Sequence, residues 1–334
     1  MNTEPTKRKS LLFDDEMPKE YGQSDKKSTE STIPNSDATV FRHKTFGSDT
    51  YSSVHRSEIF VNGGQLGDFS QNQKFTLNFL ELGTQPKVRF DIIENEFEDG
   101  MMLKDQFGGL LEKIVRLKDN LELILNGKGT MLRVSNKQEL RDKWEELKKE
   151  LKEDETIQQI PLPQQNEMYA KGDLEFSPEY DLAADLRKSF FHASLFFPLY
   201  NTNWSEEATV PITNQFVMSS LFNAMRIPLR LSVNLSYDEE TNEHLIKVDG
   251  NVDKSLLSRA SVEAAYKKEY PFLKGMFSKY SCDLFALYGI DAETHQLTYA
   301  EIELEERVND NLQAKQTLYI EKIEEEPQNT EENA

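Results

Sequence analysis

The chain has 334 residues, of which 37% are hydrophobic and 10% aromatic, so it holds enough apolar side chain for a large packed interior. Its 59 acidic and 39 basic residues give a formal net charge of -20. This charge repels phosphate backbones and anionic lipid headgroups, which argues against nucleic acid and membrane surfaces as primary ligands.

The cysteine content and the apolar stretches indicate a cytoplasmic protein. Cys282 is the only cysteine, which excludes an internal disulfide and a multi-thiolate zinc site within one chain. The first apolar cluster, Leu11-Leu12-Phe13, is too short for a secretory leader. The longest apolar stretch, residues 190–200, contains His192 and Pro198, so we expect no membrane insertion.

Residues 1–39 and 324–334 are rich in charged and polar side chains, and we expect both to be disordered tails. Within the first tail, Leu11, Leu12 and Phe13 lie between a basic and an acidic cluster, which is the format of a short partner-docking peptide. A chance apolar cluster is the simpler alternative.

Residues 40–152 are expected to form a first α+β lobe. Alternating apolar and polar residues predict strands at 57–61, 74–82 and 88–97, and a three- and four-residue spacing predicts a helix at 101–118. Asn126-Gly127 predicts a hairpin between strands at 121–125 and 130–134. A helix should follow, with Ser135 or Asn136 as its cap and one apolar stripe formed by Leu140, Trp144, Leu147 and Leu151.

Residues 153–167 are first charged and then rich in Gln and Pro, and they predict a linker between two lobes. The second lobe, residues 168–323, should open with a helix that starts at Ser177-Pro178 and places Leu182, Leu186 and Phe190 on one face. Strand patterns follow at 212–218, 227–237, 244–252, 280–289, 296–305 and 313–323, with a helix at 256–270. Short connections favour antiparallel pairing. The predicted fold class is therefore α+β, with two lobes of mainly antiparallel sheet packed with amphipathic helices.

A search for catalytic chemistry assigns no catalytic, cofactor-binding or metal-binding residue. The chain has no glycine-rich phosphate loop before a helix, no helical His pair and no Gly-x-Ser-x-Gly sequence. Cys282 lies in an apolar strand pattern, which is typical of a buried and unreactive thiol. Adjacent hairpins that carry His244 and His295 would form a metal site only if neighbouring acidic residues joined them, and solvated turns are the default interpretation.

One segment is unusually aromatic and suggests either core packing or a pocket for an apolar ligand. Its six large side chains are Phe190, Phe191, Phe196, Phe197, Tyr200 and Trp204.

Three functions remain open from the sequence. The leading hypothesis is a non-catalytic interaction or scaffold component that binds another protein, in its sharper form a basic one. The second is a carrier of a hydrophobic small molecule or lipid; the interleaved strands and helices resemble incomplete-barrel lipid carriers at the level of fold alone. The third is a carboxylate- or metal-dependent hydrolase. The sequence does not define the oligomeric state.

Overall fold

The structure is a computed structural model, and it describes residues 39–99, 108–205, 209–273 and 277–323. Both expected tails therefore lie outside the described residues, apart from Thr39, as do Leu11, Leu12 and Phe13. The described part is an α+β protein, as the sequence predicted, with one antiparallel sheet of 11 strands. Among the described helices, none is both long and apolar enough to cross a membrane.

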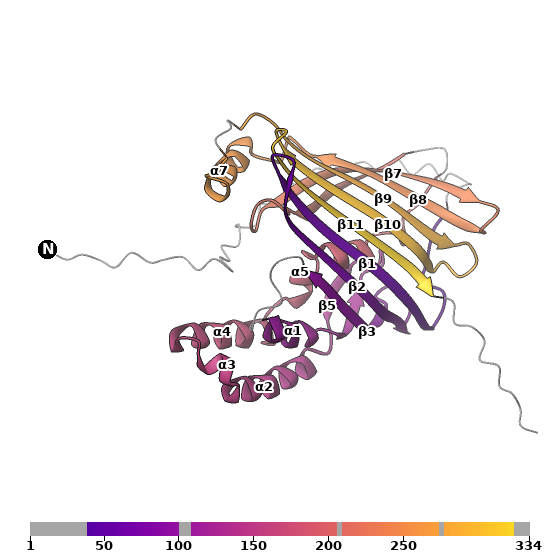
Figure 1. Cartoon of the computed structure of the whole chain (residues 1–334). Coiled ribbons are helices and arrows are strands. Elements are labelled where there is room, and N and C mark those ends of the chain that lie inside the picture. Colours follow the sequence, from indigo (N-terminus) through magenta and orange to yellow (C-terminus); the bar gives the residue numbers. More distant parts are fainter. Residues whose placement is uncertain (1–38, 100–107, 206–208, 274–276, 324–334) are drawn as a thin grey trace, which may run out of the picture. The chain divides into compact units, whose positions relative to one another are not determined.

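Helices interrupt the series of strands at three places along the chain, after β3, after β5 and after β8 (Figure 1). The strands are β1 (Gly47–Val61), β2 (Gly64–Glu81), β3 (Lys87–Asp99), β4 (Asn120–Leu125), β5 (Met131–Val134), β6 (Val210–Met218), β7 (Arg226–Asp238), β8 (Glu243–Val252), β9 (Tyr280–Asp291), β10 (Leu297–Val308) and β11 (Leu312–Ile323). The helices are α1 (Gly108–Arg116), α2 (Lys137–Glu153), α3 (Glu155–Gln158), α4 (Leu162–Glu175), α5 (Leu182–Leu186), α6 (Phe190–Leu195) and α7 (Arg259–Glu269).

The pairing of β1 with β11 corrects the expectation of two lobes. The sheet order is β5-β4-β3-β2-β1-β11-β10-β9-β8-β7-β6, so strands from both sides of the expected linker belong to one sheet. The β1–β11 ladder runs from Thr50 opposite Ile323 to Val61 opposite Leu312. Nothing in the described ranges indicates two lobes. Residues 153–167 contain α3 and the first residues of α4, because Asp154 caps α3 and Pro161 precedes α4.

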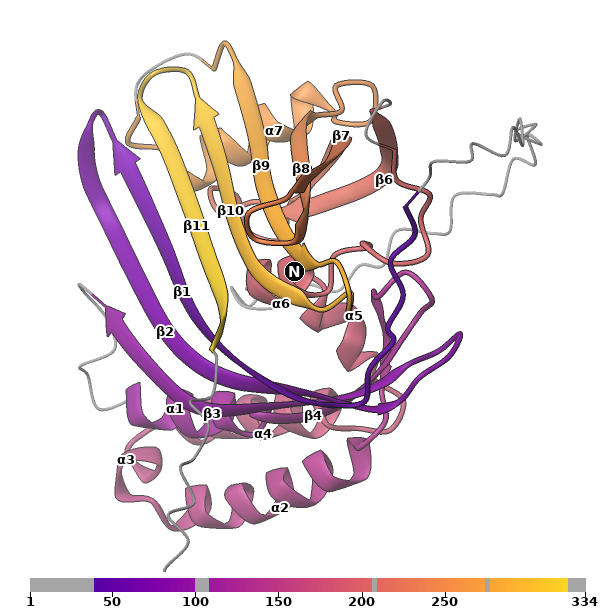
Figure 2. The same ribbon diagram turned by 90° about the vertical axis from the view of Figure 1, so that its right-hand side faces the viewer.

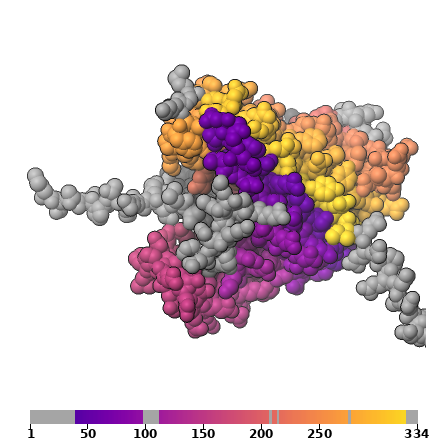
Figure 3. Space-filling view, viewed as in Figure 1, coloured from indigo at the N-terminus to yellow at the C-terminus, as the bar shows by residue number. Residues whose placement is uncertain are grey.

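The sheet curves around a filled interior, with α5 and α6 inside the curve and α1 to α4 beyond β3 and β4 (Figure 2). Alternate residues of each strand face inward, which gives β10 a buried inner row that includes Ile302 and Leu304. Phe191 of α6 packs edge-on against Phe75 of β2, with ring centroids 5.5 Å apart. The outward sides of β10 and β11 form part of the surface seen in Figure 3, and no described helix covers them in that view.

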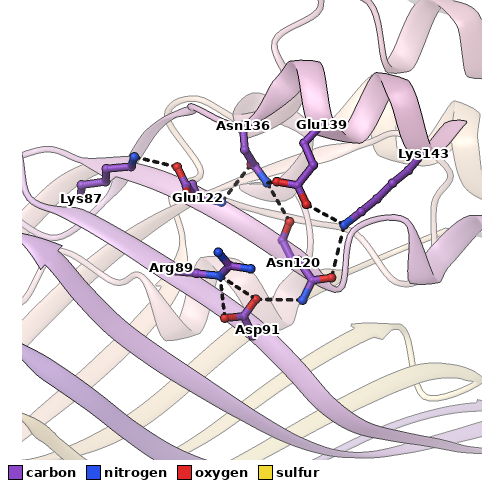
Figure 4. Close-up of polar contacts among 8 residues, drawn as sticks. All are labelled: Lys87, Arg89, Asp91, Asn120, Glu122, Asn136, Glu139 and Lys143. Atoms are coloured by element: carbon purple, nitrogen blue, oxygen red, sulfur yellow. Dashed lines mark hydrogen bonds and ion pairs between the residues drawn. The ribbon is translucent and has the colours of Figure 1, made fainter.

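Helix α2 buries the stripe that its sequence predicted, formed by Leu140, Trp144, Leu147 and Leu151. Its first turn is tied to β3 and β4 by a network of polar side chains (Figure 4). In this network the Asn136 side chain accepts a hydrogen bond from the backbone amide of Glu122 and donates to the carbonyl of Asn120. Asn136 therefore joins the helix to the sheet, and its side chain does not cap α2.

Two local turns differ in detail from the expectation. The β4–β5 hairpin is confirmed, but the positive φ falls on Gly129, and the Asn126 side chain accepts hydrogen bonds from the amides of Lys128 and Thr130. The predicted helix start at Ser177-Pro178 is wrong. Helix α5 begins at Leu182, because the Asp181 carboxylate accepts a hydrogen bond from the amide of Ala184, and Phe190 belongs to α6.

A second buried cluster lies where the β6–β7 connection meets α7. Leu221 and Phe222 of this connection pack with Val262 and Tyr266 of α7. The cluster also contains Val308 and Leu312, from the ends of β10 and β11 that are near one another in the sheet. These contacts fix the β6–β7 connection against the inner side of the sheet.

Candidate functional site

The strongest candidate site is a cavity of about 220 Å³ between α6 and the inner face of the sheet. Strands β6, β7, β9 and β10 supply most of its apolar wall. The apolar residues of the wall include Phe190, Ala193, Phe197, Leu231, Leu284 and Ala286.

The cavity exists because small residues stand where the inner face of β9 meets α6. Ala286 and Ala193 both line it, and neither side chain is long enough to fill the space. Phe197 and Tyr288 bound one side as a stacked pair, with ring centroids 5.4 Å apart. On the neighbouring strand β8, Gly250 pairs with Leu231, and a Cβ on Gly250 would lie 2.4 Å from the Leu231 side chain. The Leu231 side chain therefore uses the space that a larger residue at position 250 would fill.

Two cationic residues, Arg187 and Lys188, line the cavity where α5 leads into α6. The Lys188 ammonium lies 2.6 Å from a carboxylate oxygen of Asp185. The Arg187 guanidinium donates a hydrogen bond of 2.6 Å to the carbonyl of Met131, and its other terminal nitrogen is 3.8 Å from Asp181. About a third of each cationic side chain is exposed, at 33% for Arg187 and 35% for Lys188.

Ser219 and Gln316 are further polar residues of the cavity wall, and they connect it to a buried carboxylate. The Ser219 hydroxyl donates to Glu306 at 2.6 Å, and the Gln316 amide donates to the Ser220 hydroxyl. Glu306 also accepts from Tyr280 at 2.8 Å. Burial raises the pKa of Glu306, while its hydrogen-bond donors act in the opposite direction.

A histidine extends this polar chain to β1. His55 and the Gln316 side-chain oxygen are 3.2 Å apart, and the His55 ring lies 5.5 Å from that of Phe190 in the cavity wall. Burial lowers the pKa of His55, and the contact with Gln316 opposes that shift. The polar chain therefore runs from Tyr280 through Glu306, Ser220 and Gln316 to His55, beside a mainly apolar space.

The six aromatic residues that the sequence singled out lie in different surroundings in the structure. Phe190 and Phe197 line the cavity. Phe196, Phe197 and Tyr200 line a smaller hollow of about 40 Å³. Phe191 packs on Phe75, and Trp204 is fully buried with its indole N–H donating to the carbonyl of Leu199 at 2.8 Å.

Two histidines, His43 and His295, line the smaller hollow. The His43 ring lies against that of Tyr200, with centroids 3.7 Å apart and the ring planes tilted by 31°, and burial lowers the pKa of His43 to about 4. His295 and His244 both pack on the ring of Phe41, at 5.5 and 5.3 Å. The hairpins thus do bring His244 and His295 near each other, as one hypothesis required.

Both ring nitrogens of His295 have partners, since Nδ1 accepts from the amide of Arg42 at 3.0 Å and Nε2 lies 2.8 Å from the Lys44 ammonium. Within the described ranges, no group of three or more His, Cys, Asp or Glu side chains could hold a metal ion. Cys282 is buried on the inner face of β9, and burial raises the pKa of its thiol.

Sequence reasoning missed the polar part of the site. The sequence interpretation did not single out Arg187, Lys188, Ser219, Glu306 or Gln316. Glu306 occupies an inward position of β10 among apolar neighbours, and this break in the alternation is the signal that could have identified it. The sequence matches no family model and no curated protein.

Proposed function

We propose that this protein binds a small, mainly apolar molecule in the cavity between α6 and the sheet. The observation that carries the proposal is the partly open cavity of about 220 Å³ with a predominantly apolar wall. An engineered apolar cavity of about 150 Å³ in another protein stays free of water and binds benzene. A somewhat larger cavity suits a ligand of one ring, two small fused rings or a short chain.

Cavity filling tests the proposal directly. In the double variant Ala193→Leu/Ala286→Leu, the added carbon atoms would occupy the space that the ligand needs. The neutral dye 1-naphthylamine, a fused two-ring molecule of about the size of octanoate, should bind the wild-type protein and shift its fluorescence to shorter wavelength, and the variant should bind it at least about tenfold more weakly. The thermal midpoint should not fall, because leucine fills an existing void.

The matched control is Ala265→Leu on α7, which places the same side chain outside the cavity wall. It should leave dye binding unchanged. Equal dye binding by the double variant and the wild type, or no dye binding by the folded wild-type protein, would contradict the proposal.

A second candidate function, binding of a basic protein, is supported by an open hollow on the outer side of β8 to β11. The acidic residues Glu243, Asp291 and Glu321 line this hollow together with the rings of Tyr299 and Tyr319. Burial and the neighbouring carboxylates raise the pKa of Tyr319, of which 42% is exposed. Carboxylates beside exposed aromatic rings suit a lysine or arginine side chain.

The test of this second function is salt-dependent capture with a charge-neutralised variant. A stoichiometric partner should be retained by the wild-type protein at low salt, and it should be lost at high salt and with Glu243→Gln/Glu321→Gln. Glu58→Gln on β1 is the control for a change of charge elsewhere. Equal retention by the double variant and the wild type would contradict an interface at this hollow.

A further inference from the structure

We propose that the ligand of the cavity is a small apolar carboxylate, and that Arg187 and Lys188 hold its charged group. This inference rests on the proposed function, because it names the chemical class of molecule that the same cavity takes.

The charge of the cavity wall is the first argument. Among the described residues of the wall, Arg187 and Lys188 are the only Lys, Arg, Asp or Glu, although the chain as a whole carries a formal net charge of -20. Their partners, Asp181 and Asp185, do not line the cavity. A neutral apolar ligand would require no cation there, and two cations in a mainly apolar wall favour an anion.

The unused hydrogen-bonding capacity of the two cations is the second argument. A guanidinium has five N–H donors, and Arg187 uses one of them in the bond to Met131, while its distance of 3.8 Å to Asp181 is too long for a hydrogen bond. The Lys188 ammonium has three donors, one of which contacts Asp185. Donors therefore remain for a carboxylate, the group that a guanidinium binds in bidentate geometry.

The size and polarity of the remaining wall limit the rest of the ligand. Leu229, Leu284, Ala286 and Ile302 form an apolar floor on the inner face of the sheet. The space is about one and a half times the volume that accommodates benzene, which corresponds to a body of roughly eight carbon atoms. Octanoate is the simplest molecule with this combination of charge and size.

The first experiment compares three probes with the same chain and different head groups. Octanoate, octan-1-ol and octylamine would each displace 1-naphthylamine from the full-length protein at pH 7 and low salt. Octanoate should bind about tenfold more tightly than octanol, because it alone gains charge-assisted hydrogen bonds, and octylamine should bind most weakly. The advantage of octanoate should shrink at high salt, because one third of each cation is exposed.

The second experiment removes one charge and keeps the apolar stem. Lys188→Met should lower the affinity for octanoate several-fold and leave the affinity for octanol unchanged. Lys247→Met, on the outer side of β8, is the matched control and should change neither. Arg187→Met extends the test, with far-ultraviolet circular dichroism to establish that the variant is folded without the contact to Met131.

The outcomes separate the two proposals. If octanol binds as tightly as octanoate, or if Lys188→Met weakens both equally, the carboxylate inference is overturned and the apolar-ligand function stands. If the dye and all three probes fail to bind the folded protein, the proposed function falls and the inference falls with it.

Discussion

The Glu306 carboxylate shows how a single residue can be held in an unfavourable environment. Only 1% of Glu306 is exposed, on the inner side of β10. It accepts hydrogen bonds from the hydroxyls of Ser219 and Tyr280 and from the amide of Ser220. Two of these donors belong to the β6–β7 connection, so Glu306 anchors that connection beside the cavity wall. Burial nevertheless dominates and raises the pKa of Glu306.

This raised pKa predicts a specific dependence of stability on pH. Because the folded pKa lies above the ordinary value of 4.5, the folded state binds more protons than the unfolded state in the interval between them. The contribution of Glu306 is therefore fully present below about pH 4.5 and is lost as the pH rises through the folded pKa. Glu306→Gln removes this titration. Its stability relative to wild type should increase from pH 4 to pH 8, as measured by urea denaturation.

The comparison of Glu306→Gln with the wild type cancels the histidines, which titrate in the opposite direction. Burial lowers the pKa of His43 and of His192 to about 4. The stability that each neutral histidine contributes to the folded protein is therefore lost as the pH falls below 6.5, and this loss is the same in the wild type and in Glu306→Gln. If the difference in unfolding free energy between Glu306→Gln and the wild type stays constant from pH 4 to pH 8, burial does not raise the pKa of Glu306.

At the scale of elements, the contact of α2 with α4 depends on a glycine. A Cβ on Gly172 of α4 would lie 2.1 Å from the Trp144 ring of α2. The Trp144 indole N–H donates to the carboxylate of Asp173 at 2.8 Å, so the ring cannot turn away without losing this bond. The neighbouring residue Lys148 also lies 2.5 Å from Asp173. The two helices therefore meet through a fixed aromatic ring and a residue that has no side chain.

Gly172→Ala should destabilise the protein by about 1–3 kcal/mol, because the new methyl group overlaps a buried ring that is held in place. Equilibrium denaturation followed by the fluorescence of the two buried tryptophans, Trp144 and Trp204, would measure the change. Gly67→Ala on β2 is the control, since a Cβ there meets nothing within 4 Å. A loss no larger for Gly172→Ala than for Gly67→Ala would contradict the close contact of the helices.

At the scale of the whole described structure, one sheet joins the two halves of the chain. The β1–β11 ladder pairs Tyr51 with Lys322 and Ser57 with Gln316, and β1 also pairs with β2 along most of its length. Because β1 is hydrogen-bonded to β2 on one side and to β11 on the other, it cannot detach without separating the N-terminal strands of the sheet from the C-terminal strands. Unfolding of either half therefore exposes the inner surface of the other.

The predicted consequence is a single cooperative transition. Differential scanning calorimetry should give one peak, with a calorimetric enthalpy equal to the van't Hoff enthalpy. Residues 168–323 expressed alone should not show this transition, because β11 would lose its neighbour β1 and the core would lose the side chains of β1 to β5. Two resolved transitions, or an independently folded C-terminal fragment, would contradict the single sheet and favour two lobes.

The α+β class, the β4–β5 hairpin, the buried stripe of α2 and the presence of each strand could be predicted from the sequence, although β1 and β2 begin at Gly47 and Gly64, well before the predicted strands at 57–61 and 74–82. These features depend on periods of two or 3.6 residues and on local turn chemistry, which a short segment carries within itself. For the candidate site, the sequence pointed to Phe190 and Phe197 but gave no reason to join them with Arg187, Lys188 or Ser219. The β1–β11 pairing, the buried surroundings of Glu306 and the cavity emerge only from the three-dimensional fold. Backbone N–H and C=O groups are the same on every strand, so they do not specify a partner 271 positions away, as for Tyr51 and Lys322 (322 − 51). A cavity is space left where distant elements meet, and no local pattern encodes it.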